Sequence, residues 1–202
     1  DLFLGWFKYE NSTYALSEPI GASTFFPAND EPTDKATYTF GITVPFGYHG
    51  VANGVPLGSI ILGNKTRYQW AMLQPMTTWL ATVHVNKLNV FTQWARGGTP
   101  VRVYYSDNIP QADVQGYALA AEMLPYFESL VGPYPFKSYG SIVVEDPILY
   151  YALETQAMST FPVGAADEAI VAHELAHQWF GNQLSVACWE DLWIAEGIAT
   201  YF

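Results

Sequence analysis

The sequence predicts an α+β protein with an antiparallel, β-rich N-terminal part and a C-terminal part that mixes helices with strands. Of the 202 residues, 50% are hydrophobic, which is enough to build a sizeable core. Residues 1–108 contain short runs of Thr, Val, Tyr, Phe and Trp between clusters of Gly, Pro and Asn. After residue 108 the hydrophobic residues recur at intervals of three and four. We therefore predict two domains, 1–108 and 109–202.

The strands of the first domain are predicted from alternation and composition. The run "YTFGITV" alternates between apolar and polar residues, as a strand with one buried face does. The runs "TRYQWAML", "LATVHVNKLNVFTQW" and "TPVRVYYS" are similarly rich in β-forming residues. The clusters "FPANDEPTD" and "FGYHGVANGVPLG" between these runs predict turns.

The second domain begins with a predicted helix. Apolar residues from Val114 to Phe127 follow helical spacing and predict an amphipathic helix of about 20 residues that ends at Gly132. The segments "YGSIVVEDP" and "ALETQAMSTF" then read as extended chain. The run "ADEAIVAHELAHQWFG" predicts a helix with Asp167 in its first turn and Gly181 as its stop, and "LWIAEGIATYF" predicts a further helix.

The net charge of −11 excludes a classical electrostatic match to nucleic acid, because acidic surfaces repel phosphate backbones. No apolar run approaches the ~18 residues of a membrane span, so a soluble protein is predicted, either cytoplasmic or secreted. The single cysteine, Cys188, excludes an internal disulfide and is expected to be buried. The absence of an initial Met and the apolar helical pattern at the end suggest a piece of a longer protein. The oligomeric state and the compartment are left open.

The stretch "HELAHQWFGN" carries the strongest functional signal. His173 and His177 are four residues apart on a predicted helix, so both imidazoles can bind one metal ion. Glu174 is offset from the pair and is placed to contact a water on that ion. Three ionisable groups in so apolar a segment are costly unless something pairs them, which disfavours a purely structural role.

A third ligand is expected from Glu196, which eighteen residues separate from His177 and which lies on the next predicted helix. Two histidines and one glutamate suit Zn²⁺ and leave its fourth position to water, whose pKa falls to roughly 7. Thr200, one turn after Glu196, is a candidate supporting residue. Trp179, Trp189 and Trp193 are expected to pack between the two helices.

These residues resemble the zinc aminopeptidases of the aminopeptidase N type. The likeness rests on "HELAHQWFGN" and "WEDLWIAEG", and extends through "YALETQ", "VGPYPFKSYGSIVV" and "FFPANDEPTDKATYTFGITVP". It implies a β-rich N-terminal domain followed by the first part of a thermolysin-like zinc peptidase domain. It also implies that His173, His177 and Glu196 bind zinc and that Glu174 is the general base.

The resemblance further implies a site for the free amino terminus of a peptide. The family signature Gly-x-Met-Glu-Asn aligns with residues 151–155, which places Ala152 in the substrate site and puts Glu154 on the α-ammonium. Glu18 aligns with a second ammonium-binding residue of the family. The glycine of the signature is replaced here by Tyr151, which leaves the preferred N-terminal residue open.

The implied activity is the release of N-terminal residues from peptides. Family members also use a tyrosine from further along the chain to stabilise the oxyanion, so these residues alone are expected to hold zinc and to hydrolyse peptides weakly. Two alternatives remain: a thermolysin-type endopeptidase and a non-enzymatic binding module that keeps the motif.

Overall fold

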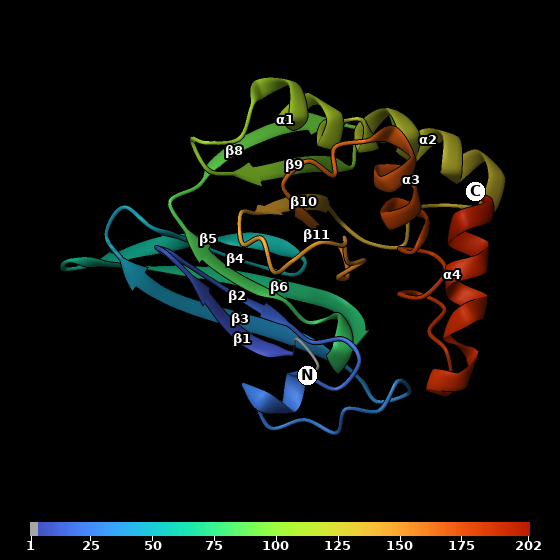
Figure 1. Cartoon of the computed structure of the whole chain (residues 1–202), viewed down its shortest axis with the longest axis horizontal. Helices are drawn as coiled ribbons and strands as arrows, with labels where there is room; N and C mark the ends of the chain where they lie inside the picture. The colour runs from blue at the N-terminus through green and yellow to red at the C-terminus, as the bar shows by residue number, and fades with distance from the viewer. Residues whose placement is uncertain (1–3) are drawn as a thin grey trace.

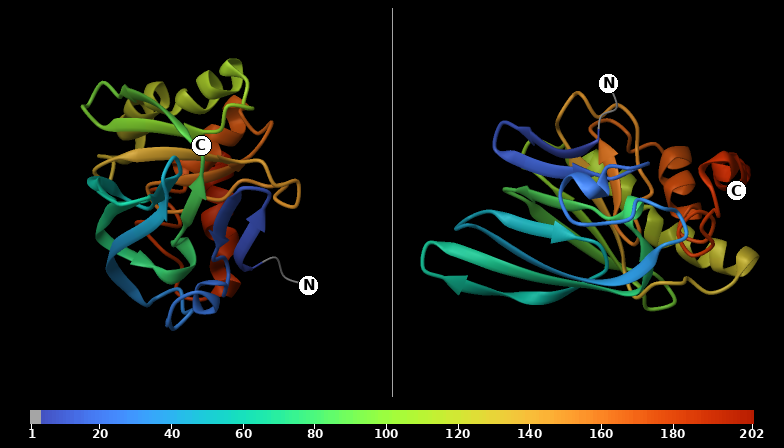
Figure 2. Two further views of the ribbon diagram at one scale, coloured as in Figure 1. Left: turned by 90° about the vertical axis from the view of Figure 1, so that its left-hand side faces the viewer. Right: turned by 90° about the horizontal axis from the view of Figure 1, so that it is seen from below.

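Two antiparallel sheets occupy most of the N-terminal part in the computed structural model, which describes residues 4–202 (Figure 1). The first sheet has the strand order β1-β2-β7-β4, and the second has the order β3-β6-β5. Their bounds are β1 Gly5–Tyr9, β2 Ser12–Leu16, β3 Lys35–Pro45, β4 His49–Ala52, β5 Val55–Leu62, β6 Lys65–Thr77 and β7 Val83–Asn86. The β3-β6-β5 sheet projects away from the helices, as both Figure 1 and the view from below in Figure 2 show.

A third sheet joins the two predicted domains. Its order is β11-β10-β9-β8, with bounds β8 Asn89–Trp94, β9 Pro100–Tyr105, β10 Tyr139–Val144 and β11 Ser159–Pro162. Strand β10 pairs in parallel with both neighbours and every one of its residues is buried, as expected of a strand covered on both faces. Two strands before residue 108 and two after it thus share one sheet, and the division at 108 stays a prediction.

The α-helices lie along the top and one side of this sheet (Figure 1). Their bounds are α1 Gln111–Ala118, α2 Ala120–Val131, α3 Glu168–Ala176 and α4 Leu192–Tyr201. A continuous hydrophobic core joins them to the sheets, with Trp79, Tyr117, Leu124, Phe161 and Leu175 all at most 2% exposed. In residues 4–202, no helix has the length and apolar character needed to cross a membrane.

The single helix predicted up to Gly132 is in fact two. The amide of Gln93 donates a hydrogen bond to the Ala118 carbonyl, which therefore turns away from the helical ladder. Glu122 N–H bonds the Leu119 carbonyl instead, at 2.9 Å, and this tighter turn separates α1 from α2. The predicted end at Gly132 is confirmed, since Gly132 caps α2 with φ +101°.

The predicted stop of the motif helix at Gly181 is wrong. Asp167 begins α3 as expected, accepting a hydrogen bond from Ala169 N, but the helix ends at Ala176. The carbonyls that follow accept hydrogen bonds from backbone amides five residues later in the chain. For example, Asn182 N donates to His177 O at 3.1 Å. Gly181, with φ +122°, lies inside this wider turn.

Two expectations about packing are also wrong. Cys188 is exposed, and its Sγ lies 3.3 Å from Asp191 Oδ2, because the segment between α3 and α4 runs over the surface. Trp193 is 70% exposed on the outer face of α4, so it does not pack between the helices. Trp179 is buried, but its ring lies against Phe127 and Tyr134, and Trp189 lies edge-on against Trp79.

Candidate metal and substrate site

His173 and His177 meet Glu196 at one point. The Nε2 atoms of the two histidines are 2.9 Å apart. Glu196 extends from α4 to place Oε2 3.4 Å from His173 Nε2 and Oε1 3.6 Å from His177 Nε2. One ligand atom from each residue lies within 4.8 Å of the other two, which is compact enough for a single ion.

The second nitrogen of each ring has its own partner. His177 Nδ1 lies 3.0 Å from the Phe180 carbonyl, which can only accept, so a neutral His177 carries its lone pair on Nε2. His173 Nδ1 lies 3.4 Å from Thr200 Oγ1, the supporting position predicted for Thr200. The Nε2 atoms therefore face each other and the carboxylate, an arrangement that a shared cation stabilises. The donor set fits zinc.

The site contains more carboxylates than positively charged groups, which favours the binding of a cation. Burial lowers the pKa of His177, but the charges of Glu154, Glu174 and Glu196 outweigh this effect and raise the pKa to about 10. Burial and then Glu154 and Glu196 raise the pKa of Glu18 to about 9. Hydrogen bonds from the two histidines lower the pKa of Glu196 to about 2. Bound cations would relieve this crowding of carboxylates.

Glu174 lies beside the cluster of three without joining it. Its side chain is buried, and Oε2 has no hydrogen-bond partner among the described residues. Burial, followed by the charge of Glu154, raises its pKa well above the usual value. A raised pKa makes this carboxylate a better proton acceptor than an exposed one.

Glu154 lies in the loop between β10 and β11, next to the bridge between Leu153 and Thr160. It is only 4% exposed, and its Oε1 lies 4.0 Å from His177 Nδ1 without a hydrogen-bond partner among residues 4–202. An unpaired buried carboxylate oxygen is costly and is a suitable partner for an incoming ammonium group.

One cavity of about 520 Å³ contains every predicted site residue, although they come from the turn after β2, the loop after β10, helix α3 with its C-cap, and helix α4. Its lining consists of Glu18, Tyr151, Ala152, Leu153, Glu154, Ala169, Ile170, His173, Glu174, His177 and Glu196. Ala169 and Ile170 also line the cavity and were not predicted from the sequence. Their positions four and three residues before His173 place them on the same helix face, so helical periodicity alone could have identified them.

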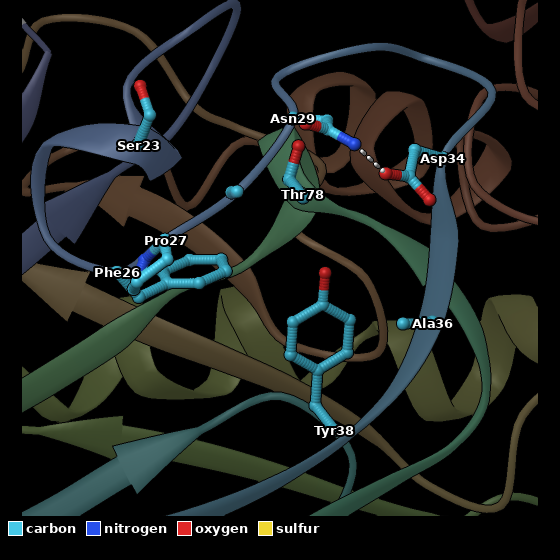
Figure 3. Close-up of a pocket in the computed structure, with 9 residues that line it drawn as sticks. Ser23, Phe26, Pro27, Asn29, Asp34, Ala36, Tyr38 and Thr78 are labelled. Carbon is cyan, nitrogen blue, oxygen red and sulfur yellow. Dashed lines mark hydrogen bonds between the residues drawn. The ribbon is translucent and has the colours of Figure 1, made fainter.

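A second cavity of about 630 Å³ lies beside β3 and has different chemistry (Figure 3). Tyr38 points its hydroxyl into it, and Asp34 accepts a hydrogen bond from Asn29 across its rim at 3.0 Å. The residues that line it include no histidine. The larger cavity is therefore not the candidate metal site.

Comparison with known proteins matches two family models. The peptidase family M1 domain matches residues 116–202, and the peptidase M1 N-terminal domain matches residues 10–80. This order confirms the predicted fold class, a β-rich N-terminal domain followed by the start of the peptidase domain. Both models together support the resemblance that the motifs indicated.

Individual relatives agree. Aminopeptidase A of Gloydius brevicauda is 31% identical over 203 residues, and glutamyl aminopeptidase of Sus scrofa is 32% identical over 206 residues; each match covers 92% of this chain. The chain spans 21% of the length of these relatives. An M1 zinc metallopeptidase from Deinococcus radiodurans is 33% identical with a TM-score of 0.89, and a mutant form bound to a Tyr-Ser-Ala substrate is 32% identical with a TM-score of 0.91. Each of these two structures is matched over 99% of this chain and 47% of its own.

Proposed function

Because this chain belongs to the M1 family of peptidases, we propose that it forms part of a zinc-dependent aminopeptidase that releases the N-terminal residue of peptides. The observation that carries the proposal is the juxtaposition of two groups in one cavity. His173, His177 and Glu196 lie close enough together to hold one cation, and Glu154 has an unpaired buried oxygen in the same cavity.

His173, His177 and Glu196 would hold the zinc ion. Zinc bound by three such ligands acts as a Lewis acid and makes water nucleophilic near neutral pH. The Phe180 carbonyl and the Thr200 hydroxyl keep the two rings oriented through their Nδ1 atoms.

Glu174 would act as general base. Because burial raises its pKa, its carboxylate can take a proton from the attacking water at Oε2 and return it to the leaving nitrogen. The same residue thus serves as base in the first step and as acid in the second.

Glu154, with Glu18, would bind the α-ammonium group of the substrate, and Ala152 lines the same cavity. An ammonium group offsets the buried negative charge of these carboxylates. An internal peptide bond carries no charge and would leave them unpaired. This difference favours an aminopeptidase over a thermolysin-type endopeptidase.

Two measurements test the proposal. Metal analysis after dialysis against limiting zinc should find one zinc per chain, and none in a His173→Ala and His177→Ala double variant. Zinc-free wild-type protein would refute the metal site and favour a non-enzymatic module.

The second measurement concerns the amino terminus. The whole protein should hydrolyse an aminoacyl anilide and leave its N-acetylated form intact. Equal cleavage of both would instead identify an endopeptidase. The residues described here, assayed alone, should turn over the anilide weakly.

A further inference from the structure

Two buried amide side chains hold the backbone of Glu154 from behind the cavity. Gln178 Nε2 donates to the Glu154 carbonyl at 3.2 Å, and Asn182 Nδ2 donates to the same carbonyl at 2.7 Å. Both side chains are 0% exposed, and neither lines the cavity. They belong to the segment that follows His177, so the motif that carries the histidines also holds the loop of Glu154.

Gln178 makes further contacts that tie this loop to α3. Its Oε1 accepts a hydrogen bond from Ala157 N at 2.8 Å, and its Nε2 lies 3.2 Å from the Glu174 carbonyl. Ala157 has φ +60°, a left-handed conformation that is unfavourable for a residue with a Cβ. The bond from Gln178 stabilises this turn, and with it the position of the residues on either side.

The carboxylate of Glu154 lacks comparable support. Its Oε1 has no hydrogen-bond partner among residues 4–202, and its nearest cationic group is His177 Nδ1 at 4.0 Å. The direction in which this carboxylate enters the cavity therefore depends on its backbone. Since electrostatic recognition depends on placement within a fraction of an ångström, the amides behind the backbone affect how well the carboxylate meets a ligand.

We propose that Gln178 and Asn182 are positioning residues, which act through the Glu154 backbone to set the affinity of the site for a free α-ammonium group. The proposal rests on the proposed function, because it assumes that Glu154 receives this group. It predicts that the loss of either amide side chain weakens the binding of ligands with a free amine and leaves the binding of ligands without one unchanged.

The test compares the binding of L-arginine and of Nα-acetyl-L-arginine to the zinc-loaded chain by calorimetry. Asn182→Ala removes only the shorter bond to the Glu154 carbonyl. Gln178→Met keeps the side-chain volume and removes the other bond to that carbonyl, together with the bond from Ala157 N and the contact with the Glu174 carbonyl. Each should weaken L-arginine binding about tenfold, the effect of one net hydrogen bond, and leave the acetylated probe unchanged. Adding Glu154→Gln to Asn182→Ala should cause no more loss than Glu154→Gln alone.

Gln183→Ala is the matched control. This amide is exposed and its side chain makes no hydrogen bond within the described chain, so the affinity for both probes should match the wild type. Zinc content and melting temperature are measured for each variant. If Gln178→Met does not fold, Asn182→Ala decides the result, since this variant keeps the hydrogen bond from Gln178 to the Glu154 carbonyl.

The outcomes separate the two proposals. Wild-type protein that binds both probes equally would refute the ammonium site and the proposed function with it. A wild-type preference for the free amine that survives unchanged in folded, zinc-loaded Asn182→Ala would overturn only the positioning role. An equal loss for both probes would also overturn it, because it would indicate a general structural defect.

Discussion

The buried His84 should make the stability of the fold fall in mild acid. His84 lies on β7 with 3% exposure, its Nε2 2.8 Å from Thr82 Oγ1 and 3.3 Å from Thr160 Oγ1. Burial lowers its pKa from about 6.5 to about 3. The folded state therefore keeps His84 neutral at a pH where the unfolded chain binds a proton.

The sign and size follow from proton linkage. As pH falls below 6.5 the unfolded state gains a proton that the folded state does not, so stability decreases until the pH reaches the folded pKa near 3. Between pH 7.5 and pH 4.5 the loss due to this one group is about 2.6 kcal/mol, from 1.36 kcal/mol per pH unit below 6.5.

The assay is urea unfolding of the wild type and of His84→Gln at both pH values. Carboxylates and the other histidines also titrate in this range, but their contributions are common to both proteins and cancel in the comparison. The wild type should lose about 2.6 kcal/mol more than the variant between the two pH values. An equal loss in both proteins would refute the reasoning, because it would mean that His84 titrates alike in the folded and unfolded states.

Three more predictions concern the site and its scaffold. Glu196→Gln should weaken zinc binding at least tenfold, measured by competition with a chelating dye, because an amide replaces a charged ligand; unchanged affinity would exclude Glu196 as a ligand. Glu174→Gln should keep one zinc per chain but lower kcat of the whole protein by about 10²–10⁴, and activity near the wild-type value would exclude a general base at this position. Asp167→Ala should cost about 1 kcal/mol in unfolding free energy, since it removes the bond to Ala169 N at the start of α3; a change below the error of the measurement would show that water replaces this cap.

The part of the site that could be predicted from sequence is the local part. Helix geometry alone brings His173 and His177 together, and the spacing to Glu196 allows a second helix to return to them. Glu18 and Glu154 are different, because no periodicity links the end of β2 to a loop more than a hundred residues later. Only the family resemblance indicated them, and the structure places both on the same cavity.

The features that sequence analysis missed depend on contacts between distant segments. The break between α1 and α2 arises because Gln93, on β8, takes the Ala118 carbonyl. The roles of Gln178 and Asn182 depend on a carbonyl from the loop after β10. Neither partner can be inferred from helical spacing, which describes only neighbours along one element.

The mixed sheet of β8 to β11 has a consequence for any attempt to isolate the peptidase half. Tyr139–Val144 is bonded along one side to β9, which precedes residue 108. A protein begun at 109 would leave one edge of this buried strand without its partner, and an unpaired strand edge can pair with other chains. Because this sheet connects the segment with the histidines to the N-terminal sheets, we expect the two parts to unfold together in a single thermal transition.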